Sequence, residues 1–235
     1  MHLIIFFLNI LDKYFQKKII NYFKKNLKQK IDIFFDVGAH KGETYESFNN
    51  SFEISKFYSF EASPINFSYL KEKKGDKNWQ IYNLALGYKE QKKIFYQSNE
   101  SSSSGFNSLN TNSNYYKKKN LILNSFSSKK NDQFELKIST LKNFMLENKI
   151  NKIDILKIDT EGFELPILKG LGEKLNKTKY IYFEHHFDDM INKEYTFTNI
   201  HDYLTTFNFK KVLKMKMAFR KSFEYIYKNN DYLND

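Results

Sequence analysis

The sequence predicts an α/β domain with a mainly parallel sheet that is covered by helices on both faces. From Lys30 onward, short apolar runs of strand length alternate with segments of helical character, which is the pattern of βαβ units. The chain has 235 residues, enough for one domain with a sizeable core. Hydrophobic residues make up 41% of the chain and aromatic residues 18%, which is a globular rather than a disordered composition.

The expected elements follow one another in a regular order. Apolar runs predict strands over 31–37, 56–62, 80–86 and 92–98, before Ser139, and over 153–159 and 179–185. Helices are expected over 43–50 and 64–73, after a cap at Ser139 or Thr140, and over 163–175 and 197–207. The chain is expected to close with two antiparallel strands, over 209–220 and 223–229.

Residues 1–30 are expected to form an amphipathic helical segment, and residues 31–235 the domain itself. Apolar residues recur in the first segment at helical spacing: Ile4, Leu8, Leu11, Phe15, Ile19 and Tyr22. The favoured interpretation is a helix packed on the domain, and the alternative is a helix lying on an acidic membrane surface. The uninterrupted apolar run, Leu3–Leu8, is far shorter than the ~20 residues of a membrane-spanning helix, and no secretory cleavage site follows it.

Residues 99–131 interrupt the alternation of strands and helices. They are rich in Ser and Asn and show little periodicity, so the sequence predicts a long loop there. Such a loop would be able to close over an acceptor as a lid. The run Ser101–Ser104 has no paired base and is therefore interpreted as loop rather than as nucleophile.

The charge composition argues against nucleic acid as the partner. The formal net charge is +11, but among the 38 basic residues only Arg220 is an arginine. Arginine is the side chain that grips phosphates and base edges with two parallel hydrogen bonds, so an excess of lysine alone indicates biased composition. The chain has no cysteine, which excludes disulfides and fits a reducing compartment. We therefore expect a cytoplasmic protein, with peripheral contact at the inner face of a membrane as the alternative.

Acidic residues stand at the ends of four expected strands. Asp36 ends the first strand and Glu61 the second, while Asp159 and Glu184 end two later ones. In open α/β sheets, ligands bind beyond the carboxyl ends of the strands, near the point where the strand order reverses. The four carboxylates therefore predict a binding site rather than scattered surface charge.

A glycine turn, Gly38–Gly42, follows Asp36 directly. Its first glycine permits a sharp bend and its second a close approach of a ligand or helix. Glu61 lies 25 residues after Asp36, where a carboxylate can accept hydrogen bonds from ribose hydroxyls.

The third glycine of a dinucleotide fingerprint is missing, as is the Gly-Lys-Ser/Thr of a P-loop. A ligand with a ribose but no phosphate fits better. S-adenosylmethionine is such a ligand, and Asp36 and Asp159 would favour its cationic groups.

Four stretches, DVGAHKGET, FEASPINFSYL, NLALG and ILKIDTEGFELPILKG, occur in this order. Together they resemble the FkbM family of S-adenosylmethionine-dependent methyltransferases over roughly residues 31–184, and Lys157–Glu164 is the most specific block. The resemblance implies the class I methyltransferase fold, which is Rossmann-like: a mainly parallel seven-stranded sheet with an antiparallel last strand. It also implies methylation of a hydroxyl on a sugar, a glycan or a secondary metabolite.

The resemblance implies roles for individual residues as well. The turn after Asp36 would hold the methionine part of the cofactor, Glu61 the ribose, and Asn83 and Ala85 would lie near the adenine. Asp159 would lie near the sulfonium and the acceptor. The residues expected to bind the cofactor are thus Asp36, Gly38, Ala39, His40, Gly42, Thr44, Glu61, Asn83, Ala85 and Asp159.

Two residues are candidates for catalysis. Asp159 is expected to touch the reacting centre, although a strand-end cap is its simpler interpretation. His185, or His186 beside it, is the candidate general base because the titration range of histidine suits the removal of a hydroxyl proton. The short Glu-His-His run at 184–186 is weak support for a metal, so no metal site is predicted.

The expected function is an O-methyltransferase that acts on a small-molecule or glycan acceptor with a free hydroxyl. The alternatives are an RNA methyltransferase and a lysine-rich nucleic-acid binding module whose glycine turn is only structural. Affinity for generic RNA that falls linearly with salt on logarithmic axes would favour these alternatives.

Overall fold

A seven-stranded sheet forms the centre of the protein, whose computed structural model describes residues 2–27, 30–98, 103–123, 132–217 and 220–232. The strands follow the spatial order β3-β2-β1-β7-β8-β10-β9. Their bounds are β1 Lys30–Val37, β2 Glu53–Glu61, β3 Trp79–Asn83, β7 Ile153–Ile158, β8 Thr178–His186, β9 Phe209–Lys216 and β10 Ser222–Asn229. Strand β10 runs antiparallel to both of its neighbours, and the pairs among β1, β2, β3, β7 and β8 are parallel. The predicted sheet with its antiparallel last strand is confirmed.

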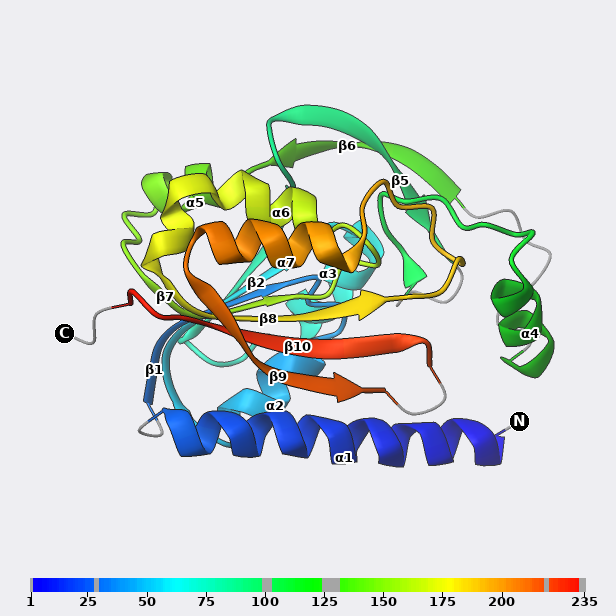
Figure 1. Ribbon diagram of the computed structural model, residues 1–235, viewed down its shortest axis with the longest axis horizontal. Coiled ribbons are helices and arrows are strands. Elements are labelled where there is room, and N and C mark those ends of the chain that lie inside the picture. The colour runs from blue at the N-terminus through cyan, green and yellow to red at the C-terminus, as the bar shows by residue number, and fades with distance from the viewer. Residues whose placement is uncertain (1, 28–29, 99–102, 124–131, 218–219, 233–235) are drawn as a thin grey trace.

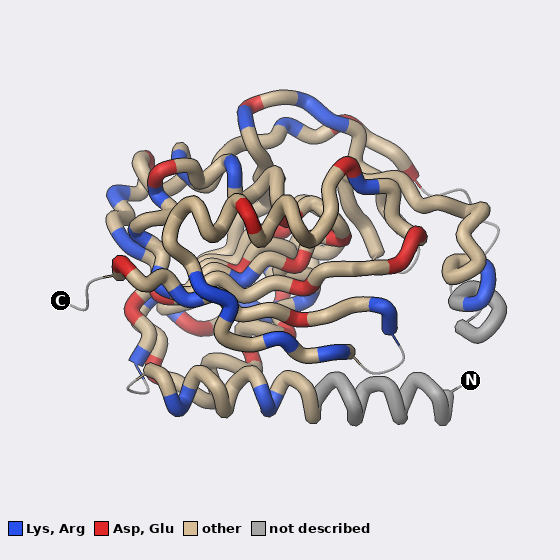
Figure 2. The backbone as a smooth tube through the Cα atoms, viewed as in Figure 1, with Lys and Arg blue, Asp and Glu red and all other residues tan. Residues whose placement is uncertain are grey.

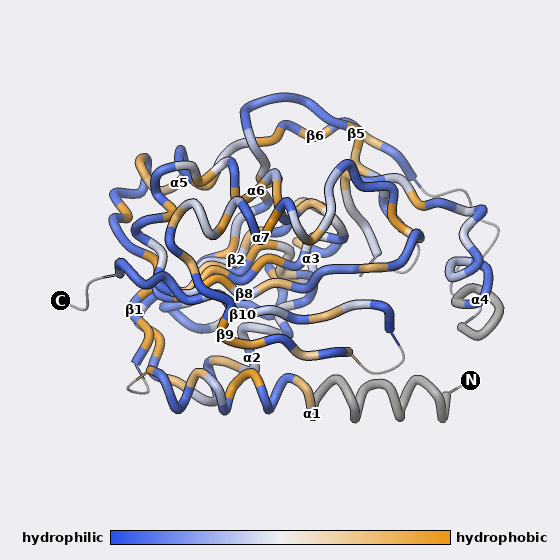
Figure 3. Tube along the Cα trace, viewed as in Figure 1, coloured by the Kyte–Doolittle hydropathy of each residue, from blue (hydrophilic) through white to orange (hydrophobic). Residues whose placement is uncertain are grey.

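Helices cover both faces of this sheet (Figure 1). On one face lie α1 (His2–Asn26), α2 (Glu43–Asn49) and α3 (Pro64–Lys73), and on the other α5 (Leu141–Glu147), α6 (Glu164–Leu171) and α7 (Phe197–Thr206). A hydrophobic core lies between the sheet and the helices on each face. Strand β1 contributes to both cores because successive side chains point to opposite faces: Phe34 packs towards α1 and α2, and Phe35 towards α5 and α6. The hydropathy of the chain follows this arrangement, with apolar residues concentrated in the central strands (Figure 3).

A second, three-stranded sheet corrects the prediction of one strand over 80–86. The chain leaves the main sheet after β3, where the Leu84 N–H donates to the Glu61 carbonyl at 3.1 Å. It then forms β4 (Ala85–Leu86), which pairs with β6 (Asp132–Ser139). The strand expected over 92–98 is β5 (Gln91–Gln97), and it pairs with β6 rather than with the main sheet.

The predicted loop over 99–131 is wrong for part of its length, because α4 spans Asn114–Leu123. Upstream of this helix, Gly105 pairs with Tyr96 and Leu109 with Ile191, so the segment is tied to β5 and to the chain after β8. Residues 99–102 and 124–131, which include Ser101 and Ser102 of the serine run, lie outside the described residues.

The remaining elements agree with the sequence to within a few residues. Thr140 is the cap of α5, since its hydroxyl accepts from the Asn143 N–H at 3.1 Å. The helix expected over 163–175 ends earlier, because Gly172 adopts a φ of 54° and a 3₁₀ turn, Gly172–Lys177, follows. The two closing strands pair antiparallel, as predicted.

The carboxyl-terminal half of α1 packs on the domain. Ile19, Phe23 and Leu27 are buried, and the Phe23 ring lies edge-on to Tyr180 at 5.5 Å between centroids. Among the described residues, no helix combines the length and apolar character that crossing a bilayer requires. The second half of this segment is therefore a helix that packs on the domain.

Replacing Phe23 by alanine should lower the free energy of unfolding by about 3–5 kcal/mol, because it empties a fully buried site. Tyr14→Ala is the matched control on the same helix. Tyr14 is 52% exposed, so its loss should cost less than about 0.5 kcal/mol. Urea unfolding monitored by circular dichroism measures both, and equal costs for the two variants would contradict the packing of α1.

Candidate functional site

The carboxyl ends of β1, β2, β7 and β8 meet along one edge of the main sheet. Strand order reverses between β1 and β7, since the chain passes outward from β1 to β2 and β3 and later returns to pair β7 with β1. This reversal is where open α/β sheets bind their ligands. Asp36, Glu61, Asp159 and Glu184 all lie at this edge, as the sequence predicts.

The turn after β1 is held against the end of β7. The Asp159 N–H donates to the Val37 carbonyl at 2.9 Å, and a Cβ on Gly38 would overlap the Asp159 carbonyl. Gly38 also has a φ of 82°, a conformation that glycine adopts without strain. His40 has a φ of 48° without being glycine, so this turn is shaped by its surroundings.

Glu61 ties this turn to β2. It is 6% exposed, and its carboxylate accepts from the N–H of His40 and from the N–H of Ser63, both at 2.8 Å. Burial raises the pKa of Glu61 to about 7, although the two hydrogen bonds oppose this shift. The carboxylate is therefore fixed beside the turn, at the position expected for ribose recognition.

The other expected cofactor residues occupy different surroundings. Asn83 is exposed and donates its side-chain amide to the carbonyls of Glu61 and Ala62, at 2.9 and 3.2 Å. Thr44 and Ala39 are buried at 7% and 2% exposure. Ala85 is 4% exposed and pairs with Ile138 in the second sheet, so its methyl is part of the core.

Lys157 forms ion pairs with two carboxylates of the site. Its Nζ lies 3.5 Å from Asp36 Oδ1 and 3.3 Å from Asp159 Oδ2. Burial works to lower the pKa of Lys157, but Asp159 and Asp36 outweigh it and the pKa lies above its ordinary value. Burial raises the pKa of Asp36 to about 6, against the attraction of Lys157. Asp36 is fully buried, and within the described structure neither of its carboxylate oxygens has a hydrogen-bond partner.

Glu224 joins this edge from a strand that runs the opposite way. It lies opposite Glu184 in the β10–β8 pair, and it accepts from the Tyr182 hydroxyl at 2.7 Å. Burial raises the pKa of Glu224 to about 7. Sequence reasoning missed Glu224 because it searched the carboxyl ends of strands, whereas the antiparallel β10 brings its amino-terminal end to the same edge. It also passed over Lys157, which the alternation along β7 places on the same face as Asp159.

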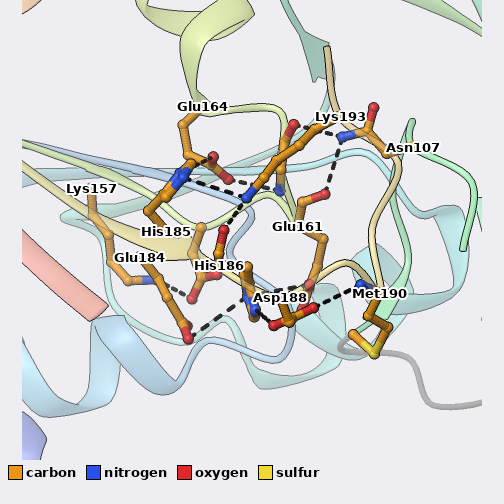
Figure 4. Close-up of polar contacts among 12 residues, drawn as sticks. Asn107, Lys157, Glu161, Glu164, Glu184, His185, His186, Asp188, Met190 and Lys193 are labelled. Carbon is orange, nitrogen blue, oxygen red and sulfur yellow. Dashed lines mark hydrogen bonds and ion pairs between the residues drawn. The ribbon is translucent and has the colours of Figure 1, made fainter. Parts of the chain in front are cut away.

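His186 lies within a group of three carboxylates (Figure 4). Its ring nitrogens are 3.5 Å from Glu161, 3.7 Å from Glu184 and 3.5 Å from Asp188. Burial alone would lower the pKa of His186, but the three acids raise it to about 10. His186 is therefore a cation at neutral pH. The structure shows no set of three or more His, Cys, Asp or Glu, within its described part, that is arranged to hold a metal ion.

His185 faces the opposite side of β8. It is 1% exposed and lies among aromatic rings, with Phe187 at 5.0 Å and Phe197 at 5.8 Å between centroids. Its nearest charged neighbours are Glu164 at 3.8 Å and Lys193 at 3.4 Å. Burial lowers the pKa of His185, so its ring is neutral at physiological pH. The alternation of side chains along β8 separates it from the face that carries Glu184 and His186.

A cavity of about 440 Å³ lies between the second sheet, the start of α6 and the segment after β8. Lys193 links this cavity to the histidines, because it donates to the His186 carbonyl and also lines the cavity wall. The lining residues are Lys93, Tyr96, Phe106, Asn107, Ser108, Gly162, Phe163, Pro166, Asn192, Lys193, Glu194 and Tyr195.

Comparison with known proteins gives a consistent result. Residues 36–211 match the family model described as the methyltransferase FkbM domain. The crystal structure of the methyltransferase FkbM from Methylobacillus flagellatus KT is similar, with a TM-score of 0.52 and 12% identity. The similarity covers 84% of this chain and 44% of that chain, so this chain spans less than half of that protein.

A second similar structure is the magnesium protoporphyrin IX methyltransferase from Synechocystis PCC 6803 with bound S-adenosylmethionine. Its TM-score is 0.55 at 7% identity, over 94% of this chain and 81% of that chain. At such identities the likeness shows the fold, which is the class I methyltransferase fold. The sequence matches none of the curated proteins with which it was compared.

The two adjacent histidines should respond to pH in different ways. The folded-state pKa of His186, about 10, lies above its ordinary 6.5, so its stabilising contribution is complete below pH 6.5 and is lost as pH rises through 10. His186→Gln should therefore cost about 3–5 kcal/mol of unfolding free energy near pH 6.5, and this cost should shrink towards pH 10.

His185→Gln is the internal control in the same experiment. Because the folded-state pKa of His185 lies below 6.5, its ring is neutral in both the folded and the unfolded state above that pH. The cost of this substitution should therefore be constant between about pH 7.5 and pH 10. Denaturant unfolding at several pH values measures both costs, and a pH-independent cost for His186→Gln would contradict the charged cluster.

Proposed function

The chain belongs to the FkbM methyltransferase family, and from that premise we propose that it methylates a hydroxyl of a sugar, glycan or secondary metabolite with S-adenosylmethionine as the donor. When bound, this cofactor supplies a methyl group on a positively charged sulfur. The observation that carries the proposal is the excess of carboxylates over cations on one face of the sheet at the strand-order reversal. Asp36, Asp159, Glu184 and Glu224 share one face there with Lys157.

The residues at this edge fit the cofactor. Asp36 is a fully buried carboxylate whose oxygens lack hydrogen-bond partners in the described structure, and such a group is costly unless a ligand uses it. Its position favours the cationic part of the cofactor. Glu61 is fixed beside the turn and would accept from the ribose hydroxyls, while the Gly38–Gly42 turn would approach the methionine part. These assignments agree with those that the sequence motifs imply.

The charge of the site disfavours a polyanionic acceptor. Around Asp159, the acids Glu161, Glu184 and Asp188 outnumber the cations Lys157 and His186. A phosphate-rich chain brought to this edge would meet like charge, which costs several kcal/mol when it is buried. Apart from Lys157 and Lys193, basic residues are also found on α1 and β9, which do not carry the acids of the site (Figure 2). The RNA alternative is therefore ranked below a neutral hydroxyl acceptor.

The work of the protein in this reaction is positioning. A hydroxyl held in line with the methyl–sulfur bond reacts faster because its translational and rotational freedom is already removed. Asp159, whose side chain is 38% exposed, is more accessible to an acceptor than Asp36 or Glu184. His185, which the sequence suggests as a base, lies on the other face of β8 at 1% exposure, so this proposal places no proton transfer on it.

Replacing Asp36 by asparagine should weaken cofactor binding by at least about tenfold, which corresponds to about 1.4 kcal/mol, because the buried negative charge is lost while its volume is kept. Asp32→Asn is the matched control, since Asp32 lies near the other end of β1 at 44% side-chain exposure. Isothermal titration calorimetry with S-adenosylmethionine measures both affinities. Equal affinity of the Asp36 variant and the wild type, with both proteins folded, would contradict the assignment.

The proposed reaction is tested with methyl-labelled S-adenosylmethionine and three pools of acceptors: free and nucleotide-linked sugars, oligosaccharides, and total RNA. We expect the label to enter a saccharide pool and to resist mild base, as an ether does. Label found in RNA alone would reverse the ranking of the two acceptor classes.

A further inference from the structure

We propose that Glu224 is the catalytic residue that accepts the proton of the acceptor hydroxyl. The inference rests on the methyl transfer proposed above and assigns a role that the sequence motifs leave unassigned.

Strand pairing places Glu224 in line with the carboxylates of the site. Phe183 of β8 pairs with Ile158 on one side and with Tyr225 on the other. The next residues along these strands, Asp159 and Glu184, therefore lie side by side, and Glu224 is the registered partner of Glu184. Since side chains alternate along a strand, all three point to the same face of the sheet. Glu224 thus stands two strands away from the end of β7, on the side away from the β1 turn.

The hydrogen bonds of Glu224 leave one oxygen ready to accept a proton. Oε1 accepts from the Tyr182 hydroxyl at 2.7 Å, which orients the carboxylate. Oε2 is buried, and no hydrogen-bond donor reaches it from the residues that the structure describes. A buried carboxylate oxygen without a donor is unfavourable, and a substrate hydroxyl would satisfy it.

The basicity of Glu224 suits the removal of a proton near neutral pH. Burial raises its pKa to about 7, and the negative charges of Glu184 and Asp159 act in the same direction. The Tyr182 hydrogen bond and the positive charge of Lys157 oppose the shift. From the other neighbouring strand, β9, the residue opposite Glu224 is Met215, which does not titrate. A base is most effective when its pKa lies close to the working pH.

The other candidates at this edge are less suited to the role. Asp159 is paired with Lys157 at 3.3 Å, and Glu184 faces the cationic His186 at 3.7 Å. Asp36 is paired with the same lysine at 3.5 Å. In Glu224 the neighbouring hydrogen-bond donor is a neutral tyrosine hydroxyl, so the carboxylate keeps its affinity for a proton.

The step is balanced in atoms and charge. The acceptor O–H bond breaks and its proton passes to Oε2 of Glu224. The oxygen electron pair forms the new bond to the methyl carbon, and the carbon–sulfur bond breaks with its electron pair left on sulfur. The carboxylate loses its negative charge as the sulfonium loses its positive charge, so no net charge is created at the buried edge. Protonated Glu224 then returns its proton to water before the next turnover.

The test uses Glu224→Gln, which keeps the shape of the side chain but cannot take up a proton. With labelled cofactor and the mixed sugar pool as probe, its methylation rate should fall by about 100-fold, the scale of a lost general base. The rise of the wild-type rate through pH 7 should also disappear. Glu135→Gln is the control, because Glu135 lies on β6 at 53% side-chain exposure and pairs with Lys92.

A second variant separates catalysis from structure. Tyr182→Phe removes the hydrogen bond that stabilises ionised Glu224, so the pH at which the rate is half-maximal should move upward. A residue that only supports the fold would reduce the rate without moving this midpoint. An unchanged midpoint in Tyr182→Phe, or a wild-type rate and pH profile in Glu224→Gln, would overturn the assignment.

A readout without turnover distinguishes this inference from the function on which it rests. Titration of S-adenosylmethionine near pH 7 in two buffers of different ionisation enthalpy reports the protons released on binding. The wild type should release protons because a bound cation favours ionised Glu224, and Glu224→Gln should release fewer. Equal release would overturn the role of Glu224 while leaving cofactor binding intact. Absence of any binding heat in the folded wild type would overturn the proposed function and this inference together.

Discussion

The ion pairs of Lys157 with Asp36 and Asp159 stabilise the group of carboxylates at the carboxyl ends of the parallel strands. The lysine is a buried residue of β7 opposite Asp36 of β1, at the point where the strand order reverses, and its positive charge stabilises both aspartates there. One cation does not compensate the remaining acids. The pKa values of Asp36, Glu61 and Glu224 are consequently raised to between about 6 and 7 by burial. The edge is thus short of positive charge, and a cationic ligand would supply it.

Much of this edge could be predicted from sequence, because strand ends and glycine turns have local signatures. The positions of Asp36, Glu61 and Asp159 follow from apolar runs that stop at an acid, and the mainly parallel sheet follows from the alternation of strands and helices. Which of two adjacent histidines faces the site is a different kind of question. It depends on which face of the sheet each side chain of β8 points to, and a shift of one residue exchanges His185 for His186. Composition carries no information about which of the two faces a given side chain takes.

Other features depend on tertiary contacts that a single sequence does not reveal. The division of the expected strand 80–86 follows from β6, which pairs with Ala85 and Leu86 from about 50 residues further along the chain. The helix at 114–123 combines lysine and leucine, which favour a helix, with asparagine and tyrosine, which favour it less, so local preference does not decide its structure. Glu224 was missed because β10 is antiparallel, so that its amino-terminal end, and not its carboxyl end, lies at the site. The acidic character of the candidate site could not be predicted from composition either, because the chain as a whole has a net charge of +11.

The most direct measurement compares S-adenosylmethionine with its demethylated product, S-adenosylhomocysteine, which lacks the positive sulfur but shares the other groups. Calorimetry at pH 8 should show the cationic compound binding about tenfold more tightly or better, a difference of about 1.4 kcal/mol. This preference should shrink as pH falls to 6, because Asp36 and Glu224, with pKa values of about 6 and 7, take up protons. Equal affinities across this range would contradict the claim that buried carboxylates at the strand-order reversal recognise a cation.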